Sequence, residues 1–146
     1  MIQPRYGVYG RIGPAIGFTW DEVRCTDGTL PRDLAFRRKA VAQARRLNRL
    51  RAGIAKRYGV PTTRVSIIVN SWFRSKAYNA KIGGASQSRH VYVPNGDATD
   101  LRIRVRLRTG KTVTLHPRFV ALLAARYVPA FNAGGIGWYD ASHGNF

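Results

Sequence analysis

The chain has 146 residues, 45% of them hydrophobic, which is enough for one domain whose core needs no disulfide. Its single cysteine, Cys25, can form no internal disulfide and has no cysteine partners for a structural zinc knuckle. No stretch approaches the roughly 20 apolar residues of a membrane span, and the first residues lack the basic start and apolar run of a signal peptide. We therefore expect no membrane span, and delivery by another route if the protein acts outside a cell.

The charge balance is strongly basic. Lys and Arg number 25 against 7 Asp and Glu, which gives a formal net charge of +18. Such a charge predicts attraction to polyanions, which include nucleic acid, teichoic-type wall polymers and anionic lipid. Charge alone does not choose among these partners, and general solubility explains it equally well.

The N-terminal part predicts little regular structure. Residues 1–17 are rich in Gly and Pro, a composition that suits neither a helix nor a central strand, and we interpret them as an extended arm. Within residues 18–31, Thr19 followed by Glu22 fits a capping box. We expect a short helical turn there.

A long amphipathic helix is predicted over residues 33–58, where Leu residues and Ile54 recur at helical spacing. Gly59 and Pro61 are typical of its C-terminal end. The run VSIIVNSWF at 65–73 then predicts a buried strand. The basic face of the helix is interpreted as solvated, and its residues are Arg37, Arg38, Arg45, Arg46 and Arg49.

Alternating residues predict a second strand. After a loop at 74–99, LRIRVRLR at 101–108 places an apolar residue at every second position, as in a half-buried strand. Thr109-Gly110 predicts a hairpin turn. Pro117 suits the first turn of a helix to about Tyr127, and GGIGWY at 134–139 predicts a closing strand.

These elements predict an α+β fold, with helices packed on one side of a small, mostly antiparallel sheet. We expect residues 18–146 to form one domain behind the arm at 1–17, since no linker or internal repeat interrupts them.

The residues that could hold a metal are few. A catalytic zinc needs about three protein ligands from His, Cys, Asp and Glu, and the chain has three histidines and seven acids in all. Two pairings of His with an acid stand out: His90 with Asp100, which immediately precedes the patterned strand, and Asp140 with His143 near the C-terminus. An acid three residues before a metal-bound His is well placed to act as a general base.

The stretch SWFRSKAYNAKIGGASQSRHVYVPNGDATDLRI resembles the core motif of the zinc D-Ala-D-Ala carboxypeptidase family, which comprises peptidoglycan DD- and LD-metallopeptidases with the Hedgehog/DD-peptidase fold. FTWDEVRCTDG at 18–28 also looks like the N-terminal segment of that family. The matching positions follow the family's order and are Arg74-Ser75, Tyr78-Asn79, Gly83-Gly84, Ser88, His90, Gly96, Ala98, Asp100 and Gly135-Ile136-Gly137.

The resemblance implies a zinc ion held by His90, Asp100 and His143. It further implies that Asp140 is the general base or acid and that Arg74 holds the substrate carbonyl and stabilises the oxyanion. The implied reaction is hydrolysis of a peptide bond at D-amino acids in bacterial peptidoglycan.

The resemblance further implies that Ser88 and Tyr78 bind the substrate. As an alternative, Ser88 orients the metal-binding residues. The family's usual spacing from His90 would select Asp97 as ligand. We favour Asp100, because it keeps the Gly-x-Ala-x-Asp frame and the start of the strand; Asp97 stays the alternative. Asn145 stands where the family often has an acid.

Other motifs have simpler interpretations. His116 is expected at a strand-to-helix corner, where it can cap the helix before Pro117. Gly83-Gly84 is interpreted as a flexible turn, because no Walker-type Lys-Ser/Thr follows. The aromatic residues are expected in the core and the cleft wall rather than on a base-stacking platform, and they are Trp72, Phe73, Tyr92, Trp138 and Tyr139.

Three functions are weighed. The first is a zinc peptidase that acts on peptidoglycan peptide stems, as a D-Ala-D-Ala carboxypeptidase or endopeptidase. Its size and basicity suit a bacteriophage product, either an endolysin or a virion tail component that contacts other tail proteins. The second is a catalytically weak or inactive wall-binding or structural module of a phage tail. The third is a nucleic-acid binder, which lacks any helix-turn-helix, zinc-finger or RNP-type pattern.

Overall fold

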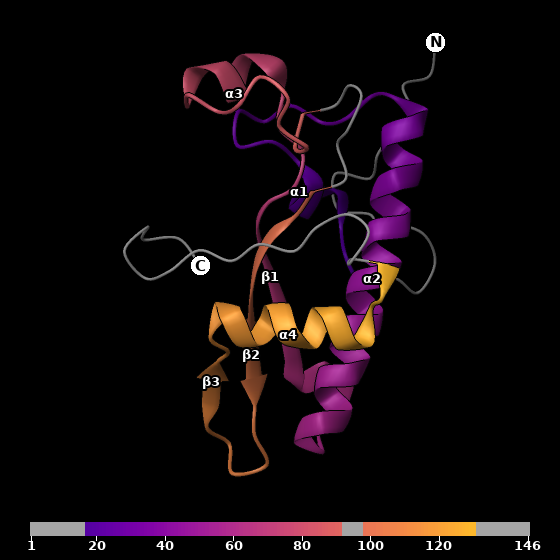
Figure 1. Cartoon of the computed structure of the whole chain (residues 1–146), viewed down its shortest axis with the longest axis vertical. Coiled ribbons are helices and arrows are strands. Elements are labelled where there is room, and N and C mark those ends of the chain that lie inside the picture. Colours follow the sequence, from indigo (N-terminus) through magenta and orange to yellow (C-terminus); the bar gives the residue numbers. More distant parts are fainter. Residues whose placement is uncertain (1–16, 92–97, 131–146) are drawn as a thin grey trace. The chain divides into compact units, whose positions relative to one another are not determined.

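The computed structural model describes residues 17–91 and 98–130 (Figure 1). The chain divides into two compact units. The first unit contains the described residues up to Arg45 together with 71–91 and 98–100, and the second contains 46–70 and 101–130. The expected arm at 1–17, apart from Gly17, and the expected strand at 134–139 lie outside the described residues.

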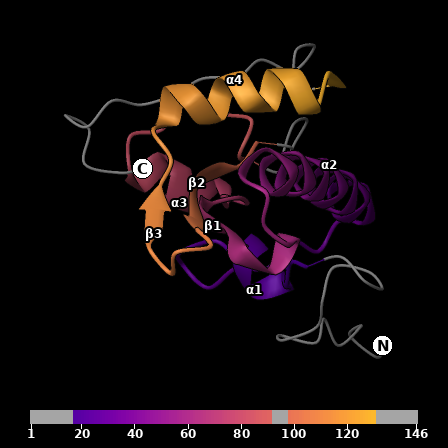
Figure 2. The ribbon, with the colours of Figure 1, turned by 90° about the horizontal axis from the view of Figure 1, so that it is seen from below.

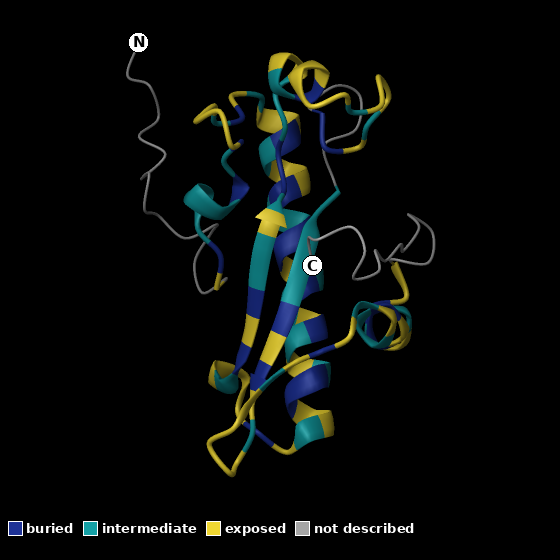
Figure 3. Cartoon of the chain, turned by 90° about the vertical axis from the view of Figure 1, so that its left-hand side faces the viewer, coloured by how far each residue is buried: buried dark blue, intermediate teal, exposed yellow. Residues whose placement is uncertain are grey.

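The sheet has three strands in the order β1-β2-β3, formed by Val65–Ser71, Asp100–Arg106 and Thr112–Thr114. It is antiparallel, and β2 pairs with β3 in a register that sets Val105 opposite Val113. Figure 3 shows buried and exposed bands alternating along β1 and β2. The fold is therefore α+β with a small antiparallel sheet, as expected.

The two predicted strands differ in detail from their sequence interpretation. The run at 65–73 is not a continuously buried strand, because Ser66 and Asn70 are exposed between buried or half-buried neighbours. Its last two residues, Trp72 and Phe73, lie beyond the end of β1. The hairpin turn is confirmed at Thr109-Gly110, where Gly110 has a φ of 89°.

The long helix is confirmed as α2, Leu34–Tyr58. Asp33 caps its start, since Oδ1 accepts the backbone N–H groups of Ala35 and Phe36 at 2.7 and 3.1 Å. At its other end Gly59 has a φ of 62°, and the Val60 N–H donates to the Ala55 carbonyl at 3.0 Å. This is the glycine-ended helix terminus that the sequence predicts.

In the second unit, α4 covers Pro117–Tyr127 with Pro117 in its first turn. His116 caps it as expected, because its Nδ1 accepts the Arg118 N–H at 3.2 Å. Figures 1 and 2 show α4 running from the end of β3 toward α2. The contact with α2 is close: a Cβ on Gly53 would lie 2.3 Å from the Tyr127 ring. Gly53 thus allows the two helices to touch.

In the first unit, α1 is the single helical turn Trp20–Val23, and its capping box is confirmed by a 2.6 Å bond from the Thr19 N–H to Glu22 Oε2. The core of this unit contains two edge-to-face aromatic pairs, Phe18 with Trp72 and Phe36 with Phe73. Trp72 and Phe73 are therefore core residues, as expected. Tyr92, Trp138 and Tyr139 lie outside the described residues.

The segment 74–99 is not a simple loop, because it contains the short helix α3, Lys76–Lys81. Ser75 caps this helix by accepting the Tyr78 N–H at 3.1 Å. Gly84 does more than provide a flexible turn: a Cβ there would lie 2.2 Å from Oδ1 of the buried Asn79. No described helix is long and apolar enough to cross a membrane.

Candidate metal centre

His90 is the residue around which the candidate site is built. It is 9% exposed and lies in a turn closed by a 3.1 Å bond from the Val91 N–H to the Ser88 carbonyl. The segment pairs with the chain that follows β1: the Arg74 N–H donates to the His90 carbonyl at 2.8 Å, and Arg74 and Val91 form a parallel bridge. One hydrogen bond within the turn and one from the chain after β1 therefore fix the backbone around His90.

The His90 ring is fixed in the same way. Its Nδ1 lies 3.0 Å from the carbonyl oxygen of Trp72. Because a carbonyl oxygen only accepts, Nδ1 must carry the proton in this contact. The second ring nitrogen, Nε2, is then the atom that faces the site, which is the arrangement found in metal-binding histidines.

Asp100 meets His90 from the start of β2. Its Oδ2 lies 3.4 Å from Nε2 of His90. Thr99, the preceding residue, accepts a 3.5 Å contact at Oγ1 from Nε2 of the buried Gln43 on α2. The side chain of Asp100 is 28% exposed, so it remains accessible to a ligand.

The separation of these two atoms fits a zinc ion. Ligand atoms about 2.0–2.2 Å from a tetrahedral zinc lie about 3.3–3.6 Å from each other. The 3.4 Å between Nε2 of His90 and Oδ2 of Asp100 falls in this range. Within 17–91 and 98–130, no group of three or more His, Cys, Asp and Glu residues is placed to hold a metal. The pair could supply two of the roughly three protein ligands that a catalytic zinc needs, and the third would have to come from another residue.

Arg74 lies beside the pair. Its Nη2 donates to Oδ2 of Asp100 at 3.1 Å, and its Nε donates to Oγ of Ser71 at 3.2 Å. The side chain is 19% exposed. The guanidinium and the His90 ring therefore approach the same carboxylate oxygen, so that residues 71–74, 90 and 100 form one network.

Of the other expected site residues, the structure describes only Ser88 and Tyr78. Ser88 is adjacent, since its Oγ lies 3.3 Å from the His90 N–H. Tyr78 is half-buried on α3. Asp140 and His143 lie outside the described residues, as do Asn145 and Asp97, the alternative to Asp100.

A second polar cluster was not expected from the sequence. Asp27 accepts the Ser75 hydroxyl at 2.6 Å and the Thr29 N–H at 2.9 Å, and the Ser75 N–H points at Sγ of Cys25 at 3.5 Å. The hydrogen bonds from Ser75 and then Thr29 hold the pKa of Asp27 well below its usual range. This cluster ties the loop after α1 to the start of α3, next to Arg74.

Sequence reasoning also missed the Trp72 carbonyl, Ser71 and Gln43. A backbone carbonyl has no residue-type signal, and Ser71 and Gln43 are ordinary residues in a strand and a helix. The Ser75 cap has a local signal, since a serine precedes a helix-compatible run.

Comparison with known proteins identifies one family. The profile described as Peptidase M15 matches residues 17–111, well over half of the chain. The match includes His90, Asp100 and Arg74 and ends before Asp140 and His143. Searches of the curated proteins and of the solved structures give no significant match. The extent of the match shows that this chain belongs to the Peptidase M15 family.

Proposed function

We propose that the protein is a zinc metallopeptidase that hydrolyses peptide bonds at D-amino acids in bacterial peptidoglycan, as a carboxypeptidase or an endopeptidase. The observation that carries the proposal is the His90–Asp100 pair, in which Nε2 and Oδ2 are 3.4 Å apart and the Trp72 carbonyl sets the tautomer of His90. Membership of the Peptidase M15 family supports it.

In the proposed site, His90 and Asp100 would supply two zinc ligands and His143 the third. Bound zinc would supply Lewis acidity and an activated water near neutral pH. Asp140 would act as the general base and then the general acid, taking a proton from the attacking water and passing it to the leaving amine. Ser88 and Tyr78 contact the substrate peptide.

Arg74 has two roles in this proposal. Its guanidinium carries five N–H groups, and those engaged by Ser71 and Asp100 leave others to bind the substrate carbonyl. A permanently charged donor beside that carbonyl stabilises the negative oxygen as the carbon becomes tetrahedral. The contact with Asp100 holds the carboxylate toward His90 at the same time.

The test is mass spectrometry of muropeptides from sacculi treated with the zinc-loaded protein. We expect stems shortened by a D-amino acid or new free amino termini, and no change with His90→Ala or Asp140→Ala. An unchanged muropeptide profile from folded, zinc-loaded protein would refute the proposal and favour the wall-binding module. Delivery by bacteriophage lysis or on a virion tail stays a prediction from the sequence.

A further inference from the structure

Charge is divided unequally between the two units. Residues 46–70 and 101–130, the described part of the second unit, contain thirteen Lys and Arg residues and no Asp or Glu. The acids of the described chain all belong to the first unit, which holds the His90–Asp100 pair. The described part of the second unit is thus exclusively basic, whereas the first unit holds both acids and bases.

One exposed surface of the second unit presents this charge in a regular array. Arg104 and Arg106 on β2 stand opposite Thr114 and Thr112 on β3. Directly opposed residues, and residues two apart on a strand, share one face of a sheet. All four are exposed, whereas Ile103, which precedes Arg104, and Val105, which lies between the two arginines, are fully buried. We call Arg104, Arg106, Thr112 and Thr114 the hairpin face.

Fold stability does not explain the hairpin face. Opposite charges are the favourable cross-strand partners of Arg, and like charges on one face repel. Here both arginines face threonine, in a unit whose described residues offer no carboxylate. Charged residues often protect an edge strand from pairing, but β2 is the central strand of the sheet. An external anion accounts for the arrangement better.

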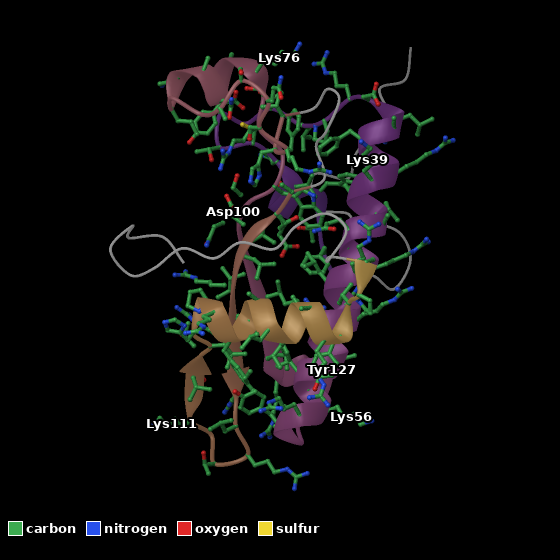
Figure 4. All side chains as sticks on the ribbon, viewed as in Figure 1. Lys39, Lys56, Lys76, Asp100, Lys111 and Tyr127 are labelled. Carbon is green, nitrogen blue, oxygen red and sulfur yellow. The ribbon has the colours of Figure 1, made fainter. Side chains whose placement is uncertain are left out.

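More cations surround the hairpin turn. Arg108 donates through Nε to the Gly59 carbonyl at 2.8 Å, and Arg64 donates through Nη1 to the Leu107 carbonyl at 3.2 Å. The first bond holds Arg108 at the C-terminal end of α2, which itself ends in basic residues, and the second holds Arg64 beside the hairpin. Figure 4 shows Lys56 and Lys111 at this same end of the unit. The positive surface therefore continues from the hairpin face to the turn.

The geometry points to an extended polyanion. Residues two apart on a strand are about 6.7 Å apart, so Arg104 and Arg106 can engage successive charged groups of a linear polymer. The threonine hydroxyls beside them are able to donate hydrogen bonds to phosphate oxygens. Among the described residues no Phe, Tyr or Trp is exposed, so this surface offers no platform on which bases stack.

We propose that the hairpin face binds the anionic phosphodiester polymers of the bacterial wall and so holds the peptidase on its substrate. The choice of wall polymer over nucleic acid rests on the proposed function as well as on the missing stacking platform. In this proposal the first unit cleaves the wall peptide, and the second unit holds the protein on the wall polymer.

The test is co-sedimentation of the full chain with sacculi that carry phosphodiester polymers, and with the same sacculi after hydrofluoric acid has removed them. The His90→Ala background keeps the sacculi intact. We expect Arg104→Gln/Arg106→Gln to weaken binding by about three- to tenfold and to flatten its salt dependence. Removal of the phosphodiester polymers from the sacculi should lower the binding of protein with an unsubstituted hairpin face to a similar level.

The matched control is Arg38→Gln/Arg45→Gln, which removes two exposed arginines from the part of α2 in the first unit. It should weaken binding less than twofold, and Arg104→Lys/Arg106→Lys should retain most of the binding. Equal losses from the two Gln pairs would overturn the proposal, since net charge alone would then act. Unchanged binding after stripping, or tighter binding to single-stranded DNA than to wall polymer, would also overturn it.

The two proposals fail separately. Binding that follows these expectations without any muropeptide release refutes the peptidase alone. Muropeptide release that is unaffected by Arg104→Gln/Arg106→Gln, on sacculi with and without polymer, refutes the anchoring role alone.

Discussion

Arg74 and Asp100 are joined by a 3.1 Å contact from Nη2 to Oδ2, and this oxygen is the one that faces Nε2 of His90. A residue expected to bind substrate therefore also holds an expected zinc ligand. Groups that orient a metal ligand typically contribute 10- to 100-fold to metal affinity. In the proposed mechanism, Arg74 thus connects metal binding with transition-state stabilisation.

The first prediction concerns this connection. Arg74→Ala should weaken zinc affinity by about 10-fold, because Asp100 loses the donor that orients it. It should also lower kcat by about 10²–10³-fold, because a donor to the developing oxyanion is lost. Competition with a zinc chelator and muropeptide release measure the two effects. Lys76→Ala, an exposed change two residues away, should alter neither. A fall in kcat with unchanged zinc affinity would contradict the orienting role.

The second prediction concerns pH. The pKa of Asp27 lies below its usual range because the charged form accepts the Ser75 hydroxyl. Its stabilising contribution is therefore full above the unfolded pKa of about 3.9 and is lost as the pH falls through the lower folded value. Asp27→Asn should lower the thermal midpoint at pH 7, and the difference from the unsubstituted protein should shrink below about pH 4.

Ser75→Ala provides the control for this pair. Ser75→Ala removes the same hydrogen bond as Asp27→Asn. The loss of stability in the double variant should therefore be smaller than the sum of the losses in the two single variants. A midpoint difference for Asp27→Asn that stays constant from pH 7 to pH 2 would show that ionisation of Asp27 is not involved.

The third prediction tests the contact between α2 and α4. Gly to Ala in a helix interior normally stabilises by about 1 kcal/mol. At Gly53 the new Cβ would lie 2.3 Å from the Tyr127 ring, so Gly53→Ala should instead destabilise by about 1–3 kcal/mol. Figure 4 shows Tyr127 beside α2. Denaturant unfolding measures the sign, and in a Tyr127→Ala background the change should become neutral or stabilising. A stabilising effect in the native background would contradict the contact.

The regular elements could be predicted where their signals are local. Helix ends could be located within a residue or two, because capping depends on adjacent residues. His116 and Pro117 indicated the start of α4, and Gly59 indicated the end of α2. The alternation at 101–108 identified β2 for the same reason. The helix α3 was missed, because its six residues are too few to show a helical period.

The site was predictable only in part. His90 and Asp100 could be named from their motif, but the contact between them depends on the pairing of residues 72–74 with 90–91. The contact of the His90 ring with the Trp72 carbonyl joins residues 18 positions apart in the sequence, and the Asp27–Ser75 hydrogen bond joins residues 48 positions apart. No local sequence pattern encodes such contacts. Asp140 and His143 lie outside the described residues and stay predictions.

The most direct test of the central claim is the zinc content of purified variants, measured by plasma mass spectrometry. We predict about one zinc per chain for the unsubstituted protein and for Asp97→Ala, and a large loss for His90→Ala, Asp100→Ala and His143→Ala. A metal-free unsubstituted protein after zinc loading, or a loss of zinc with Asp97→Ala but not with Asp100→Ala, would contradict the account.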